Sequence, residues 1–393
     1  MKSYLRYYLK NRLPLFIIIF SILLVVGVFS ASGLSFVEQV LQASSSVYSS
    51  YEPTDAGISP LVFAVCVIML ILPFFNMGNR YSLARTDMFR QTAQNKKAYR
   101  YVEHGISIGF VLAAYTISFA LFLLIAVIKN YAQPIPENTN MYHYYRVIFN
   151  YGPYFFVYLL TLLFAIGNYF ITYFFASRSN NFINSLILVV LGQVFLGSFC
   201  VLFAEMGGTR ENYFMYLPCA NACVSFGPLF LDARYTNWII YGDKSYTDVF
   251  FRNYFTGNET EIILTTMSSF IVFFTVAITG AVFFFAEKEQ SGEWAGKPDT
   301  SDAWQDVLYN LFVGTFMTWM FYSYLKNWYY DTGLAMAISF VVTIAVYYTL
   351  YGLLRRNFKP KQYQIIAMVC TMVMVIIVSM FIFGCNGFKP HVD

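Results

Sequence analysis

Few side chains in this sequence have the type and spacing that catalysis or metal binding would need. The chain has six cysteines and three histidines. Cys219 and Cys223 lie four residues apart in a polar stretch, where they could form half of a zinc site or a disulfide, but no second pair of ligands is nearby. The histidines His104, His143 and His391 are scattered, so neither a zinc-binding helix nor a histidine-based triad is predicted. We therefore expect no catalytic residue and no metal site, and the cysteines are expected to be structural.

The stretch Ala295-Gly296-Lys297-Pro298 is the nearest approach to a phosphate-binding loop. Ser291 stands where the first glycine of the Walker pattern should be, and Pro298 stands where serine or threonine should be. The sequence therefore predicts neither a nucleotide site nor a bound cofactor, and the chain is not expected to be an enzyme.

Ionisable side chains that could couple transport to an ion gradient are also few. Proton- and ion-coupled transporters keep such groups near the middle of the membrane. In this sequence the deepest are Glu103 and His104, followed by Glu205, and each lies at the end of an apolar run. Three neutral polar residues inside the runs, Asn76, Asn168 and Gln193, are expected to be hydrogen-bond partners between helices. Gly105 and Gly109 form a small-residue pair that could let two helices approach closely.

The composition and the spacing of the charged residues predict the helices on which these residues lie. Hydrophobic residues make up 58% of the chain and charged residues 12%, whereas a soluble protein carries roughly 25% charged residues. Nine charge-free runs are each long enough, at 1.5 Å per residue, to cross about 30 Å of hydrocarbon as a helix. They are residues 13–37, 56–79, 105–128, 147–177, 179–204, 262–286, 307–325, 332–354 and 362–388. The predicted fold is thus an all-α integral membrane protein with about nine transmembrane helices, and β-barrel strands would be shorter and alternate in polarity.

Lysine and arginine set the predicted orientation. If the N-terminus is cytoplasmic, most of the 25 basic residues fall on the cytoplasmic side, as the positive-inside rule requires. The basic leader, with Leu5, Leu9 and Leu13 at helical spacing, is predicted to be an uncleaved interfacial helix that turns into the first span at Pro14. We expect a multi-pass protein of the cell membrane.

Three of the segments between the predicted spans are long and polar. Residues 79–105 are basic and could form a short helix near Thr86 and Asp87, serving either as a solvated loop near anionic headgroups or as a docking helix for a cytoplasmic partner. Residues 205–261 form the largest outer loop, which is rich in aromatic residues and predicted to be an interfacial cap. The acidic turn 286–306 separates a six-span unit, residues 1–290, from a three-span extension, residues 291–393.

Over roughly residues 1–290 this arrangement resembles the ABC-2-type permease subunits of bacterial ABC transporters, particularly those of Gram-positive bacteria. The resemblance rests on the basic leader, the cytoplasmic segment after the second span, and the long outer loop between the fifth and sixth spans. In that family the segment after the second span carries a coupling helix that docks on the ATPase. The resemblance places ATPase contacts on residues of that segment and of the acidic turn: Arg85, Asp87, Phe89, Arg90, Lys96, Lys97, Glu287 and Glu289.

The function implied by the resemblance is that of a permease subunit, of the export type, that forms the membrane pathway as a homodimer or with a second permease. Separate ABC ATPase subunits would bind ATP and Mg²⁺, and no nucleic acid is expected among its partners. Two other classes stay open: a secondary transporter, which would need a buried titratable site, and a non-transporting scaffold or sensor that binds through the outer loop.

Overall fold

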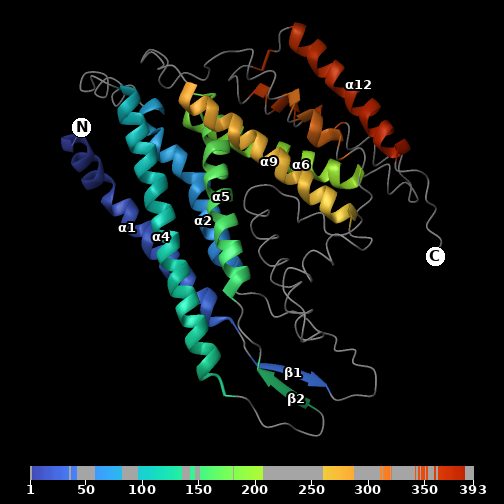
Figure 1. Cartoon of the computed structure of the whole chain (residues 1–393). Helices are drawn as coiled ribbons and strands as arrows, with labels where there is room; N and C mark the ends of the chain where they lie inside the picture. Colours follow the sequence, from blue (N-terminus) through green and yellow to red (C-terminus); the bar gives the residue numbers. More distant parts are fainter. Residues whose placement is uncertain are drawn as a thin grey trace. The chain divides into compact units, whose positions relative to one another are not determined.

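The structure is a computed structural model that describes about three fifths of the chain. The described residues are 2–34, 37–41, 58–81, 96–134, 142–146, 151–179, 181–206, 260–286 and 362–385, with short helical pieces between 310 and 359. The helices are α1 (Lys2–Ser32), α2 (Ser59–Asn76), α4 (Lys96–Ala132), α5 (Tyr151–Ala176), α6 (Phe182–Met206), α9 (Thr260–Ala286) and α12 (Gln362–Cys385) (Figure 1). A helix therefore lies at seven of the nine predicted spans, and helical pieces lie in the other two.

The fold is almost entirely helical, as predicted, but it also contains a short β-ribbon that was not predicted. Strand β1 (Val37–Leu41) pairs antiparallel with β2 (Tyr142–Arg146), with Val37 opposite Arg146 and Leu41 opposite Tyr142. Both strands come from segments between predicted spans, where β-branched and aromatic side chains favour extended backbone. Val37 was expected to end the first span, but α1 ends at Ser32 and Val37 begins the ribbon.

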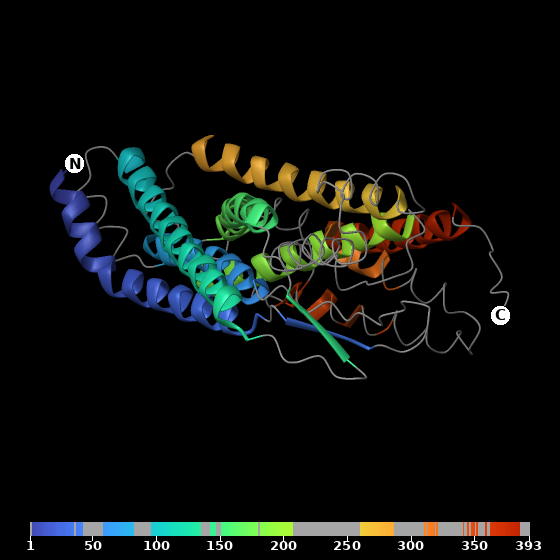
Figure 2. The ribbon, with the colours of Figure 1, turned by 60° about the horizontal axis from the view of Figure 1, so that its bottom comes forward.

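Two of the predicted helix boundaries were wrong. The chain does not leave the helix at Pro14, because α1 continues through it to Ser32. The ribbon of α1 bends along its length (Figure 2), and a proline inside a helix removes one backbone hydrogen bond and causes such a bend. The second error concerns α4, which begins at Lys96 and not near residue 105. Charged residues end an apolar run, but they do not end a helix, because its hydrogen bonds are made within the backbone.

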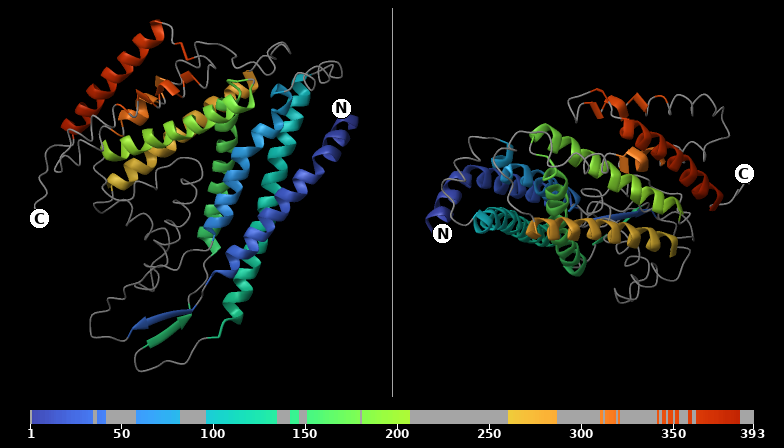
Figure 3. Two further views of the ribbon diagram at one scale, coloured as in Figure 1. Left: turned by 180° about the vertical axis from the view of Figure 1, so that it is seen from behind. Right: turned by 90° about the horizontal axis from the view of Figure 1, so that it is seen from above.

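Contacts along the chain define two compact units. The first holds α1, the ribbon, α4 from Ala98, α2 as far as Leu72 and α5 as far as Asn168. Within it α1 and α4 lie side by side and run in the same direction (Figure 3). Their contacts follow the sequence in order: Tyr8 meets Ser107, Phe16 stacks on Phe110, and Gly27 lies against Ser118. Helices one and three of an alternating membrane bundle would run in parallel in this way.

The second unit holds the remainder of α2 and α5 together with α6, α9 and the C-terminal helices. Helices α6 and α9 pack against each other. A second hydrophobic cluster joins the C-terminal region to α6: Val313, Met317, Tyr347, Tyr351 and Val375 form its centre, and Ile187 and Leu191 of α6 pack against it. The division predicted at residue 290 remains a prediction, since the turn after Ala286 lies outside the described residues.

Candidate functional site

Most of the residues predicted to contact an ATPase lie outside the part of the chain that the structure describes. These are Arg85, Asp87, Phe89 and Arg90 after the second span, and Glu287 and Glu289 after the sixth. Lys96 and Lys97 are placed, and they form the first turn of α4. They are therefore continuous with the helix that covers the predicted third span.

A polar cluster lies about two to three turns further along α4, where α4 meets the basic leader. The hydroxyl of Tyr8 donates a hydrogen bond to the backbone carbonyl of Glu103 at 3.2 Å. The same hydroxyl lies 2.8 Å from Oγ of Ser107. Since the only proton of Tyr8 goes to the carbonyl, the Ser107 hydroxyl donates to Tyr8. The start of α1 is thereby held against the start of α4.

The cluster buries two titratable side chains that the sequence had singled out. Glu103 is 9% exposed and His104 is 3% exposed. Tyr8 was missed, because the leader was interpreted through its leucines. Leu5, Leu9 and Leu13 are in fact exposed, and Tyr8 on another face of α1 is buried. A tyrosine among the basic residues of an amphipathic leader was the available signal, since a buried tyrosine hydroxyl usually finds a partner.

At the opposite end of the same helix pair, Lys129 joins the two helices. Its ammonium group donates to the backbone carbonyls of Ser32 and of Leu34, the second at 2.6 Å. The last carbonyls of a helix have no partner within the helix, and a cation there also interacts favourably with the helix dipole. Lys129 belongs to the last turn of α4, so one side chain caps α1 from its neighbour.

In the second unit the connection between α5 and α6 is a compact, buried turn. Asn181 caps α6, because its Oδ1 accepts a hydrogen bond from the backbone N–H of Ile183 at 3.0 Å. The Oγ of Ser185 lies 2.9 Å from the carbonyl oxygen of Ala176 and 3.1 Å from that of Ser179, so its single proton is shared between the two acceptors. The Ala176 carbonyl, at the end of α5, also accepts from the backbone N–H of Ser179.

The turn carries Arg178, which is buried. Its guanidinium lies 4.4 Å from the ring centre of Phe174 and 3.7 Å from that of Phe283 on α9. An arginine between aromatic faces, away from water, makes a stabilising cation–π contact. Arg178 thus ties α9 to the α5–α6 turn.

The prediction for Asn76 is confirmed. Asn76 is buried, and its Nδ2 donates to the hydroxyl of Tyr169 at 2.9 Å, linking α2 to α5. The small-residue prediction for Gly105 and Gly109 is wrong, since a Cβ added at either glycine would meet no atom within 4 Å. The close approaches are at Gly27, 3.0 Å from the carbonyl oxygen of Ser118, and at Gly280, 2.4 Å from that of Phe170. Glycine spacing alone cannot tell which face of a helix meets a neighbour.

Within the described ranges, no cluster of three or more histidine, cysteine or acidic side chains could hold a metal ion. Cys66 is a buried free thiol and Cys370 an exposed one, while Cys219 and Cys223 fall outside those ranges.

Two of the helices are long and apolar enough to cross a membrane, Leu5–Ser32 and Arg100–Ala132. Five shorter apolar helices accompany them in the described part of the chain: Pro60–Asn76, Thr161–Ala176, Phe182–Gln193, Phe273–Ala286 and Gln362–Val378.

Comparison with known proteins adds no relative. No protein-family model matches the chain, and searches of curated proteins and of solved structures find no match.

Proposed function

We propose that this chain is a multi-pass membrane permease subunit that forms a transport pathway and is driven by ATPase subunits on separate chains. The membrane setting is supported by the large apolar side chains that α1, beyond its basic leader, and α12 expose. On α1, Val25 is 64% exposed and Phe29 71% exposed. On α12 the exposed side chains are Ile365, Ile366, Val369, Val373, Met374 and Ile377. A helix that is apolar on its exposed side as well as its packed side suits lipid and does not suit water.

The core is mostly apolar, and small hydroxyl side chains are buried within it. Ser30 and Ser118 in the first unit are almost completely buried, and so is Thr172 in the second. Hydroxyl side chains of this kind are common between membrane helices. The observation that carries the membrane part of the proposal is therefore the large number of exposed apolar side chains.

The ATPase part of the proposal is supported by where charge is concentrated. Six lysines and arginines lie between residues 80 and 100, and the last three of them belong to the first turns of α4. A cytoplasmic partner that binds this segment would move α4 as a lever, and α4 is joined to α1 at both ends by Tyr8 and Lys129. Two copies, or this chain with a sister permease, would enclose the pathway, and export is the direction implied by the family resemblance.

Affinity purification of the full chain from membranes of its native host tests this proposal. We expect a Walker-motif ATPase to copurify, with ATP hydrolysis that the permease stimulates. Asp87→Ala and Lys96→Ala should reduce that stimulation severalfold, while Lys359→Ala, a basic residue of another predicted cytoplasmic turn, should not. Absence of both the ATPase and the hydrolysis would refute the ATPase part.

A secondary transporter is the second candidate, and one observation favours it. Glu103 and His104 are both buried at the start of α4, where a titratable pair could couple a proton to movement of α1 against α4. Uptake by the purified chain alone, driven by a pH gradient and abolished by Glu103→Gln, would select this candidate. If neither the native chain nor the Glu103→Gln variant shows uptake that depends on the pH gradient, the secondary-transporter candidate is excluded.

A further inference from the structure

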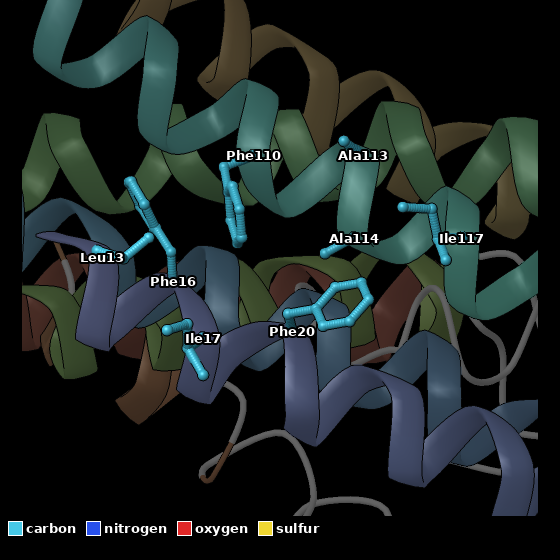
Figure 4. A pocket seen from close by; sticks show the side chains of 8 residues that line it. All are labelled: Leu13, Phe16, Ile17, Phe20, Phe110, Ala113, Ala114 and Ile117. Atoms are coloured by element: carbon cyan, nitrogen blue, oxygen red, sulfur yellow. The ribbon is translucent and has the colours of Figure 1, made fainter. Parts of the chain in front are cut away.

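An apolar groove runs between α1 and α4 in the first unit. It is lined by Leu13, Phe16, Ile17 and Phe20 of α1 and by Phe110, Ala113, Ala114 and Ile117 of α4 (Figure 4). Each helix contributes residues at the same spacing, i, i+3, i+4 and i+7, so each presents a single face to the groove. The cavity has a volume of about 290 Å³, and no polar atom contributes to its wall.

The groove exists because α4 has two small side chains where α1 has large ones. Ala113 and Ala114 stand between the larger Phe110 and Ile117, and Phe20 lies across from them (Figure 4). Phe16 stacks on Phe110 with ring centres 4.4 Å apart, which closes the packing at that end. Ala113 is exposed and Ala114 is buried, so the groove has an open side and a floor.

The end of the groove at Leu13 adjoins exposed positive charge. Lys10 and Arg6 precede Leu13 by three and seven residues, spacings that place them on the same face of α1, and both are exposed. Arg12 is engaged with the ring of Tyr8, 5.9 Å away. Glu103, the acidic residue at the same end of α4, is buried. An apolar slot that leads to two exposed cations matches a molecule with an acyl chain and an anionic headgroup.

We propose that this groove binds one acyl chain of an anionic phospholipid whose phosphate is held by Lys10 and Arg6. The inference rests on the proposed membrane setting, which would place the basic leader at the headgroup level. The cavity of about 290 Å³ is too small to take in a helix of a partner protein, which is about 10 Å across. An extended peptide would find no polar atom in the wall to pair with its backbone.

Native mass spectrometry of the full chain in detergent, with added phosphatidylglycerol or phosphatidylcholine of identical acyl chains, tests the proposal. Ala113→Trp fills the groove and should lower the affinity for phosphatidylglycerol about tenfold, the loss expected when two methylene groups are excluded. Ala120→Trp, an exposed alanine of the same helix beyond the groove, is the matched control and should leave the affinity unchanged. Ala113→Leu, a milder filling of the same space, serves if the tryptophan variant does not fold.

The headgroup is tested separately. Lys10→Gln and Arg6→Gln should each reduce the preference for phosphatidylglycerol over phosphatidylcholine about fivefold while leaving the phosphatidylcholine affinity unchanged. Equal lipid binding by the Ala113 and Ala120 variants, or the same headgroup preference in all variants, would overturn the inference. Release of the chain from membranes by alkaline carbonate would instead refute the membrane setting itself, so the two failures are distinguishable.

Discussion

Lys129 connects two helix ends that the sequence places about a hundred residues apart. Its ammonium group donates to the backbone carbonyl of Ser32, the last residue of α1, and to that of Leu34, two residues further on. The value of this contact lies in the pairing of a cation with carbonyls that have no partner in their own helix.

Lys129→Met, which keeps the apolar stem and removes the ammonium group, is expected to lower the free energy of unfolding by about 1–2 kcal/mol. Lys129→Arg should recover much of the loss, since it restores a cationic donor. Thermal melting of the purified chain, followed by circular dichroism, measures both effects. A melting temperature unchanged in the methionine variant would show that the cap does not stabilise the fold.

Gly280 is the residue where close packing of two helices depends on the absence of a side chain. A Cβ at this position would lie 2.4 Å from the carbonyl oxygen of Phe170 and 2.9 Å from its carbonyl carbon. These are backbone atoms, so they cannot move aside as the end of a flexible side chain would. Helix α9 must shift away from α5 if Gly280 is replaced.

Gly280→Ala should therefore destabilise the chain by about 1–3 kcal/mol. Gly105→Ala is the matched control, since its Cβ would meet no atom within 4 Å, and better helix propensity should make it neutral or stabilising by up to about 1 kcal/mol. The comparison is made by thermal melting of both variants. Equal melting temperatures would contradict the close α5–α9 approach.

At the scale of elements, the contacts between α5 and α6 are made by side chains close to their connection. Asn181 caps α6 through the backbone N–H of Ile183, and the hydroxyl of Ser185 is shared between the carbonyls of Ala176 and Ser179. These contacts hold the start of α6 against the end of α5.

Asn181→Ala should cost about 1 kcal/mol of stability, the usual effect of removing a helix cap. Asn181→Asp keeps an acceptor at the cap and should retain most of the stability. Hydrogen exchange of the α6 N-terminus, measured by mass spectrometry, should increase in the alanine variant and stay near native in the aspartate variant. Equal exchange in all three proteins would show that Asn181 does not fasten the helix.

The positions of the helices could be predicted from the sequence, because charge is excluded from the apolar runs they occupy. The features that could not be predicted depend mainly on contacts between residues far apart in the sequence. The ribbon pairs residues more than a hundred positions apart, and a strand's partner is not encoded in local propensity. The start of α4 at Lys96 was missed because charge marks the end of apolarity and not the end of hydrogen bonding.

At the candidate site the same limit applies. Glu103 and His104 stood out as the deepest ionisable residues, and both are buried. Tyr8 did not stand out, because only the structure brings the leader against α4. The residues expected to contact an ATPase stay a prediction, since they rest on a family resemblance and lie mostly outside the described ranges.

At the scale of the whole molecule, the proposed function requires α1 and α4 to cross a membrane in the same direction. Their starts share the Tyr8 cluster, and their ends share the Lys129 cap and lead into the β-ribbon. If the basic leader is cytoplasmic, the ribbon must be on the opposite side. This requirement needs neither a known cargo nor a known partner to be tested.

Side-specific cysteine labelling tests it directly. In a variant whose six native cysteines are replaced, single cysteines at Asn11 and Gln39 are exposed to a membrane-impermeant maleimide in right-side-out and inside-out vesicles. If α1 and α4 cross as proposed, the Gln39→Cys variant reacts only in right-side-out vesicles and the Asn11→Cys variant reacts only in inside-out vesicles. Labelling of both from the same side, in vesicles shown to be sealed, would contradict it.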